Sequence, residues 1–254
     1  MRSPLQMRGC SLQCGVRQGR EQGEKHFRGA EVFTMLEELR QEVWKANIAL
    51  PKNRLVTATS GNASARDRET GFIVIKPSGY DFDKLRREHL NVIDLNGKVM
   101  EGDMVPSVDT ATHLYVYRHR SDINGIIHTH SPYATSFAVL GQTLPLCLTT
   151  LAMEFGTHIP VSEFAEIGGE EIGKQIVEKI GSSPAILMRN HGVFTVGTTV
   201  NAALKAAIML EEAAQTCHYA MLRGKVEELP QDVIESAFKF YSEKYGQKGE
   251  HKLK

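Results

Sequence analysis

Apolar residues recur every three or four positions in several stretches of the chain, a spacing that puts them on one face of a helix. The first stretch runs from Met35 to about Leu50, and Pro51 follows as its stop. The same pattern predicts five later helices: Asp109 to about His119, Tyr133–Leu140, Gly169–Ile180, Val200 to about Leu222, and one that begins at Gln231.

Shorter apolar runs bounded by turn-forming residues predict strands between these helices. They are Leu55–Ala58, Phe72–Lys76, Val92–Leu95, Lys98–Met100, Gly125–His130, Ala185–Arg189 and Val193–Gly197. Asn96-Gly97 joins two of them and predicts a type I′ hairpin turn. Short strands with helices between and after them predict an α/β fold, a three-layer α/β/α sandwich with a central mixed, largely antiparallel sheet.

The chain has 254 residues, a length typical of one α/β domain. Residues 1–34 are rich in Arg, Gly and Gln and lack an apolar period, so we expect a disordered extension before a single domain at 35–254. The 30 Lys and Arg balance 30 Asp and Glu, and no run is long enough to cross a membrane, so neither nucleic acid nor a membrane is an expected partner. Four scattered cysteines and no secretory segment favour a cytoplasmic protein.

Two histidines lie two residues apart at the end of a predicted strand, in Gly-Ile-Ile-His-Thr-His at 125–130. Side chains alternate across a strand, so His128 and His130 share a face. His191 follows a later strand, and Gly192 after it leaves room for close approach. Packing or surface histidines are the alternative interpretation. The pattern favours a metal, because three imidazoles with an open fourth position are typical of catalytic sites for zinc or a similar divalent ion.

An acidic residue, Asp109, begins a predicted helix in Pro-Ser-Val-Asp-Thr-Ala-Thr-His at 106–113. Asp is a favoured N-cap, so Asp109 can cap this helix or reach the metal, and its position leaves both open. His113 lies one turn further on the same face and is interpreted as a supporting or packing residue.

Two turns of small residues have the composition of an anion cradle: Thr-Ser-Gly-Asn-Ala-Ser at 59–64 and Lys-Pro-Ser-Gly at 76–79. Glycine frees backbone N–H groups to point at one anion, although ordinary turns use the same residues. Together with Ser107 they supply three separate segments of donors, as a phosphate site requires.

These segments, with His-Thr-His-Ser at 128–131 and Asn-His-Gly at 190–192, resemble the class II aldolase and adducin family in order from about Met35 to Gln247. The resemblance implies a class II aldolase-like domain at 35–254. It implies Zn²⁺, or another divalent ion such as Mn²⁺ or Co²⁺, on His128, His130 and His191, with Asp109 as fourth ligand or proton carrier. It also implies a cyclic homotetramer with active sites between subunits, and a phosphate held by Gly61, Asn62, Ser78, Gly79 and Ser107.

The family contains sugar-phosphate aldolases and L-ribulose-5-phosphate 4-epimerase, and the resemblance does not separate them. Asp109 and the Thr112-His113 pair look like the epimerase, and Tyr245 resembles its closing tyrosine, which reaches the adjacent subunit's site. The epimerase has a proton-carrying Asp where this chain has Met153, which cannot carry a proton. The adjacent Glu154 points elsewhere on a regular strand or helix, so it is a candidate carrier only if the backbone there is irregular.

We therefore expect a zinc-dependent enzyme that cleaves a ketose 1-phosphate, a small-molecule sugar phosphate, to dihydroxyacetone phosphate and an aldehyde. The 4-epimerase, which uses the same retro-aldol chemistry, is the close alternative. A non-catalytic adducin-like module is a third interpretation, and the intact histidine triad argues against it.

Overall fold

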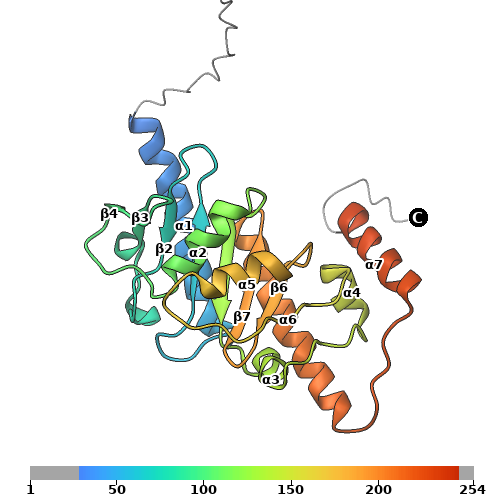
Figure 1. The fold of residues 1–254 in the computed structure, drawn as a ribbon. Helices are drawn as coiled ribbons and strands as arrows, with labels where there is room; N and C mark the ends of the chain where they lie inside the picture. The colour runs from blue at the N-terminus through green and yellow to red at the C-terminus, as the bar shows by residue number, and fades with distance from the viewer. Residues whose placement is uncertain (1–28, 246–254) are drawn as a thin grey trace, which may run out of the picture.

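The computed structural model describes residues 29–245, and over this range the chain forms a three-layer α/β/α sandwich (Figure 1). A seven-stranded sheet is the middle layer, with the strand order β4-β3-β2-β1-β5-β7-β6. In chain order the strands are β1 (Asn62–Arg66), β2 (Ile73–Ile75), β3 (Asn91–Ile93), β4 (Val99–Glu101), β5 (Gly125–Thr129), β6 (Ala185–Met188) and β7 (Gly192–Gly197).

Every pair of neighbouring strands in this sheet is antiparallel. In the described part of the chain, a parallel contact occurs only as the isolated bridge between Val161 and Leu187 at the β6 edge. The sheet is therefore more uniformly antiparallel than the expected mixed sheet.

Helices cover both faces of the sheet (Figure 1). On one face lie α1 (Gly29–Lys52), α6 (Val200–Met221) and α3 (Pro132–Leu140), and on the other lie α2 (Thr110–His119) and α5 (Glu171–Lys179). Two short 3₁₀ turns, η1 (Phe82–Lys84) and η2 (Arg87–His89), lie between β2 and β3. At the end away from β4, α4 (Thr149–Phe155) packs against α7 (Gln231–Lys244).

The alternation of side chains along β5 divides the core into two layers and orients the first histidine. Ile127 packs with α1 and α6, while Ile126 packs with α2 and α5. His128 is two residues after Ile126 and thus points to the same side, toward α2.

The first strand does not lie where the sequence pattern predicted it. Residues 55–61 form a loop, because Leu55 and Val56 are buried against α1 and α6 without pairing and Ala58 has a positive φ of 53°. The strand is instead Asn62–Arg66, which begins inside the segment at 59–64 that we interpreted as a turn. Its Asn, Ala and Ser residues are poor strand formers, and pairing with β2 on one side and β5 on the other stabilises it.

The type I′ turn predicted at Asn96-Gly97 is also wrong. Type I′ requires a positive φ at both residues, but of the two only Gly97 has one, at 85°. The hairpin closes through Asp94, whose side chain accepts hydrogen bonds from the backbone N–H groups of Asn96 and Lys98, both at 2.9 Å.

The chain ends differ from the expectation in one respect. Most of the predicted N-terminal extension lies outside the described residues, but α1 begins at Gly29, six residues before the predicted start at Met35. Between residues 29 and 245, no helix is both long and apolar enough to span a bilayer.

Candidate metal centre

The candidate site lies at one end of the sheet, where the ends of three neighbouring inner strands lie side by side. β1 and β7 both run antiparallel to β5, with Asn62 opposite His128 and Phe194 opposite His128 on the other side. The beginning of β1, the end of β5 and the beginning of β7 therefore lie side by side. His130 comes just after β5 and His191 just before β7, so both lie at this end of the sheet.

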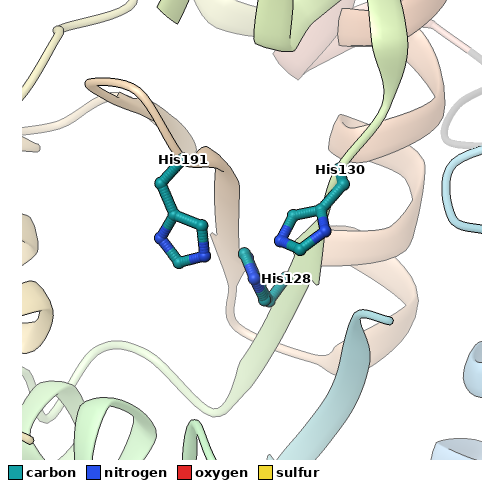
Figure 2. A group of neighbouring side chains, drawn as sticks. All are labelled: His128, His130 and His191. Carbon is teal, nitrogen blue, oxygen red and sulfur yellow. The ribbon is translucent and has the colours of Figure 1, made fainter. Parts of the chain in front are cut away.

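The three histidines predicted as metal ligands point toward one another (Figure 2). One ring nitrogen from each lies within 4.8 Å of the others. The ring centroid of His128 is 4.8 Å from that of His130 and 4.9 Å from that of His191, and the centroids of His130 and His191 are 5.2 Å apart. The structure therefore brings the three predicted ligands together in one group.

The orientation of His128 suits a metal ligand. Its Nδ1 lies 3.0 Å from the Val193 carbonyl oxygen, and in the tautomer that donates this bond Nε2 keeps its lone pair for an ion. The Phe194 ring stacks on the imidazole at 4.2 Å between centroids and holds its plane. His191, another of the three predicted ligands, has a buried Nδ1 with no hydrogen-bond partner, as expected of an atom whose partner is an ion.

The protonation of the histidines also suits a metal, because a ligand imidazole must be neutral. Burial lowers the pKa of His128 to about 3, and Asp109 opposes this only in part. Burial likewise lowers the pKa of His130 and of His191. The residues present therefore fit a divalent ion at neutral pH, and three nitrogen ligands are typical of zinc.

Gly192 is required by the close approach of β5 and β7 at this point. A Cβ atom at Gly192 would lie 2.5 Å from the Thr129 carbonyl oxygen and 2.8 Å from Cδ2 of His130. Any larger residue would push the two histidine segments apart, which confirms the prediction of close approach after His191.

Asp109 does not take the first of the two roles that its sequence position left open, the capping of α2. It occupies the N-cap position of α2, but its side chain makes no capping hydrogen bond. Instead Oδ2 accepts a hydrogen bond of 2.7 Å from Asn62, and the residue lines the same cavity as the three histidines. Burial acts to raise the pKa of Asp109, yet His128, His113 and the Asn62 bond together lower it, so the carboxyl group is ionised.

His113 packs beneath the cavity residues without lining the cavity itself. It is fully buried, its Nδ1 lies 2.7 Å from the Ser64 hydroxyl, and that hydroxyl lies 2.8 Å from the Tyr117 hydroxyl. Burial lowers the pKa of His113 to about 4, so it is a neutral packing residue next to the acidic position.

The predicted phosphate residues line one cavity of about 250 Å³ together with the histidines. Its wall includes the five residues expected to bind phosphate, Gly61, Asn62, Ser78, Gly79 and Ser107. Asn62 also donates a 3.0 Å hydrogen bond to Ser107, which links two of the three donor segments. A Cβ at Gly61 would lie 2.8 Å from the His128 carbonyl oxygen, so only glycine fits where this loop meets β5.

Sequence analysis identified Lys76 only as part of a turn and not as a functional residue of the cavity. Lys76 is 1% exposed, lines the cavity, and donates long hydrogen bonds to the carbonyls of Thr59 and Pro77 at 3.3 and 3.4 Å. Burial lowers its pKa to about 8, although Asp109 and Asp81 favour the charged form. The sequence placed Lys76 at the edge of a cradle but did not indicate that its cation would be buried there.

Two other predicted catalytic residues lie outside the cavity of their own chain. Glu154, on α4, is paired with Lys205 of α6 at 2.7 Å. Tyr245 follows the end of α7 and is 54% exposed, and its ring lies tilted against that of Tyr241 with the centroids 4.7 Å apart. Met153, the residue at the position of the epimerase Asp, is half-buried on α4 and is not among the cavity residues.

Fold and site together define an α/β/α protein in which three histidines able to hold a metal ion share one cavity with a carboxylate and two glycine turns. The family model for the class II aldolase and adducin N-terminal domain matches residues 41–218, more than half of the chain. The chain therefore belongs to the class II aldolase and adducin family, whose aldolases are metal-dependent.

Solved structures with this fold include several sugar-phosphate aldolases. One L-fuculose 1-phosphate aldolase is 31% identical with a TM-score of 0.76, over 81% of this chain and 96% of that one. The L-fuculose-1-phosphate aldolase of Thermus thermophilus is 28% identical with a TM-score of 0.64, over 75% and 98% of the two chains. The L-fuculose 1-phosphate aldolase of Glaciozyma antarctica, 23% identical with a TM-score of 0.72 over 85% and 86%, shares the fold.

Proposed function

We propose that this protein is a zinc-dependent aldolase that cleaves a ketose 1-phosphate to dihydroxyacetone phosphate and an aldehyde. The observation that carries the proposal is the shared cavity: three neutral imidazoles, an ionised Asp109 and the buried Lys76 line one space with two glycine turns. The similarity to an L-fuculose 1-phosphate aldolase at 31% identity supports the substrate class.

The substrate phosphate would be held by the donors that share the cavity with the histidines. Backbone N–H groups of the Gly61 and Gly79 turns, the Ser78 and Ser107 hydroxyls and the Lys76 ammonium supply both hydrogen bonds and positive charge. In this cavity these contacts would fix the carbon chain relative to the histidines, which is the main contribution of a positioned anion to catalysis.

Cleavage of the C–C bond leaves negative charge on the fragment that carries the phosphate. A divalent ion held by His128, His130 and His191 would supply Lewis-acid stabilisation of that charge. Asp109 would take the proton from the hydroxyl group of the carbon that departs as aldehyde, and the remaining fragment would take up a proton at the carbon of the broken bond to become dihydroxyacetone phosphate. Its Oδ2 is engaged by Asn62, which leaves Oδ1 for this proton or for the ion.

We also propose that the active protein is a homotetramer and that Tyr245 acts in the cavity of a neighbouring subunit. Tyr245 is exposed at the end of α7 and does not line its own cavity, so a catalytic role requires a second chain.

The 4-epimerase is retained as a second candidate because Asp109, Thr112 and His113 match its pattern at the acidic segment. Epimerisation needs a proton carrier on each side of the cleaved fragment, and Met153 cannot serve as one. We therefore expect an epimerase rate well below the aldolase rate.

The test is incubation of purified protein with L-fuculose 1-phosphate, 5-deoxyribulose 1-phosphate or L-ribulose 5-phosphate, with products followed by NMR. We expect dihydroxyacetone phosphate from a ketose 1-phosphate, and loss of this product after metal removal. Efficient conversion of L-ribulose 5-phosphate to its 4-epimer would replace the aldolase by the epimerase. Protein that binds no metal and converts none of the three would support the adducin-like module.

A further inference from the structure

Helix α3 touches the segments of two of the three histidines. It begins at Pro132, two residues after His130, and Ser131 precedes it as the N-cap. Near its other end, the Ala138 carbonyl accepts a 3.3 Å hydrogen bond from the backbone N–H of Asn190, the residue before His191. A shift of α3 would therefore move both His130 and the His191 loop.

The first turn of α3 is held by a carboxylate from a distant part of the chain. Oε1 of Glu211 accepts a 3.0 Å hydrogen bond from the N–H of Tyr133, and Oε2 accepts a 2.9 Å bond from the N–H of Ala134. The Ser131 side chain, at the usual capping position, makes no such bond. Glu211 therefore supplies acceptors for helix N–H groups that would otherwise lack them, and its charge is favourable at a helix N-terminus.

Glu211 is itself on a rigid support. It lies in the middle of α6, whose neighbouring residues Leu210, Ala213 and Ala214 are buried in the core. The carboxylate thus connects a helix fixed against the sheet to a nine-residue helix, α3, that follows His130 and contacts the loop of His191.

We propose that Glu211 is a positioning residue for the metal centre: by fixing the first turn of α3 it holds His130 and His191 at the separation that a single ion requires. The inference rests on the proposed function, since it assumes that the three histidines bind a metal. Glu211 touches neither cavity nor ligand, so its effect is transmitted through α3. Substitution of partners that orient metal ligands typically weakens metal affinity by roughly 10–100-fold.

The test is titration of metal-free protein with Co²⁺, followed by the visible absorption of the bound ion, at a temperature well below the unfolding midpoint. Glu211→Ala should weaken Co²⁺ binding by roughly 10–100-fold and change the spectrum, because the ligand geometry relaxes. Glu211→Gln, which keeps one acceptor oxygen, should fall between Glu211→Ala and wild type and serves if the alanine variant does not fold. Glu212→Gln is the matched control, since Glu212 is the exposed next residue on α6, and it should bind as wild type does.

The outcomes separate the two proposals. A lower unfolding midpoint with unchanged Co²⁺ affinity and spectrum in the Glu211 variants would make Glu211 a purely structural cap and overturn the positioning role alone. Wild-type protein that takes up no Co²⁺ would contradict the metal centre, and with it both proposals.

Discussion

The Glu154 carboxylate lies 2.7 Å from the Lys205 ammonium, and this ion pair connects α4 to α6. The Lys205 ammonium also lies 4.3 Å from the centroid of the Tyr241 ring, which adds α7 to the contact. Glu154 is thus engaged at the junction of three helices, while the cavity of its own chain is lined by other residues.

Glu154→Gln should therefore act on stability more than on turnover. Loss of this partly exposed pair should lower the free energy of unfolding by about 0.5–1 kcal/mol, a shift of about 1–4 °C in the midpoint. Lys205→Met is the matched control and should show a similar shift. Thermal unfolding and steady-state kinetics check both variants. A fall of about 100-fold in turnover for Glu154→Gln alone would instead make Glu154 a proton carrier.

His191→Ala should remove the metal along with the activity. Two remaining imidazoles form a weak site, and catalytic zinc sites use three protein ligands. Elemental analysis of purified protein should find about one divalent ion per chain in wild type and far less in the variant. His158→Ala is the control, since His158 is exposed and paired with Glu228 at 3.0 Å. Full activity in metal-stripped wild type would end the metal hypothesis.

Lys76→Met should weaken substrate binding without destabilising the fold. Removal of a charged hydrogen bond to phosphate typically costs about 1.5–3 kcal/mol, so KM should rise roughly 10–100-fold. Because burial holds the pKa of Lys76 at about 8, below its ordinary 10.5, the charged form is disfavoured in the folded protein. The variant should consequently unfold at the wild-type temperature or above it.

The same shift predicts the pH dependence of binding. Wild-type KM should rise as pH increases through about 8, while that of Lys76→Met should stay flat, and kinetics from about pH 6.5 to 9.5 check this. Lys84→Met, a change at an exposed lysine, should keep the wild-type profile. An unchanged KM in Lys76→Met would remove this residue from the phosphate site.

Metal-free protein should lose stability as pH falls below about 6.5. Burial lowers the pKa of His128 to about 3 and that of His113 to about 4, whereas both are near 6.5 in the unfolded chain. Between these pKa values the unfolded chain binds more protons than the folded chain. Each histidine therefore lowers the free energy of unfolding by up to about 1.4 kcal/mol for every unit by which the pH falls. Denaturant titrations from about pH 7 to 4.5 measure the slope. His113→Asn should reduce it by one proton, and an equal slope would contradict the prediction.

Tyr245→Phe should reduce turnover with little change in metal content or folding, by roughly 10²–10⁴-fold if the hydroxyl carries a proton. Mixing this variant with His191→Ala in reassembled oligomers should recover part of the activity, because a hybrid site can combine histidines from one chain with the tyrosine of another. A stable monomer with full activity would rule out the shared site.

The histidine group could be predicted from sequence because it depends on two local rules, the two-residue period of a strand and the position of glycine after a strand. The strand Asn62–Arg66 could not, because its residues have turn-forming composition and only pairing with both neighbours makes it a strand. The predicted turn at Asn96-Gly97 failed since Asp94 accepts the backbone hydrogen bonds that set a different turn.

The roles of Lys76 and Glu211 depend on burial and on contacts between distant segments. A lysine in sequence is normally solvated, and nothing around Lys76 indicates that its ammonium will be enclosed beneath Phe82. Glu211 acts 77 and 78 residues away from the N–H groups that it binds, which no local pattern can show.

The antiparallel order β1-β5-β7 has a consequence for how the protein is made. The chain emerges from the ribosome in sequence order, so β1 and β5 can pair before β7 exists. His128 and His130 are then already present, but the loop with His191 and the α6 carboxylate that holds α3 are synthesised much later. The three histidines therefore come together only after most of the domain has been translated. An ion can bind all three only when the fold is nearly complete.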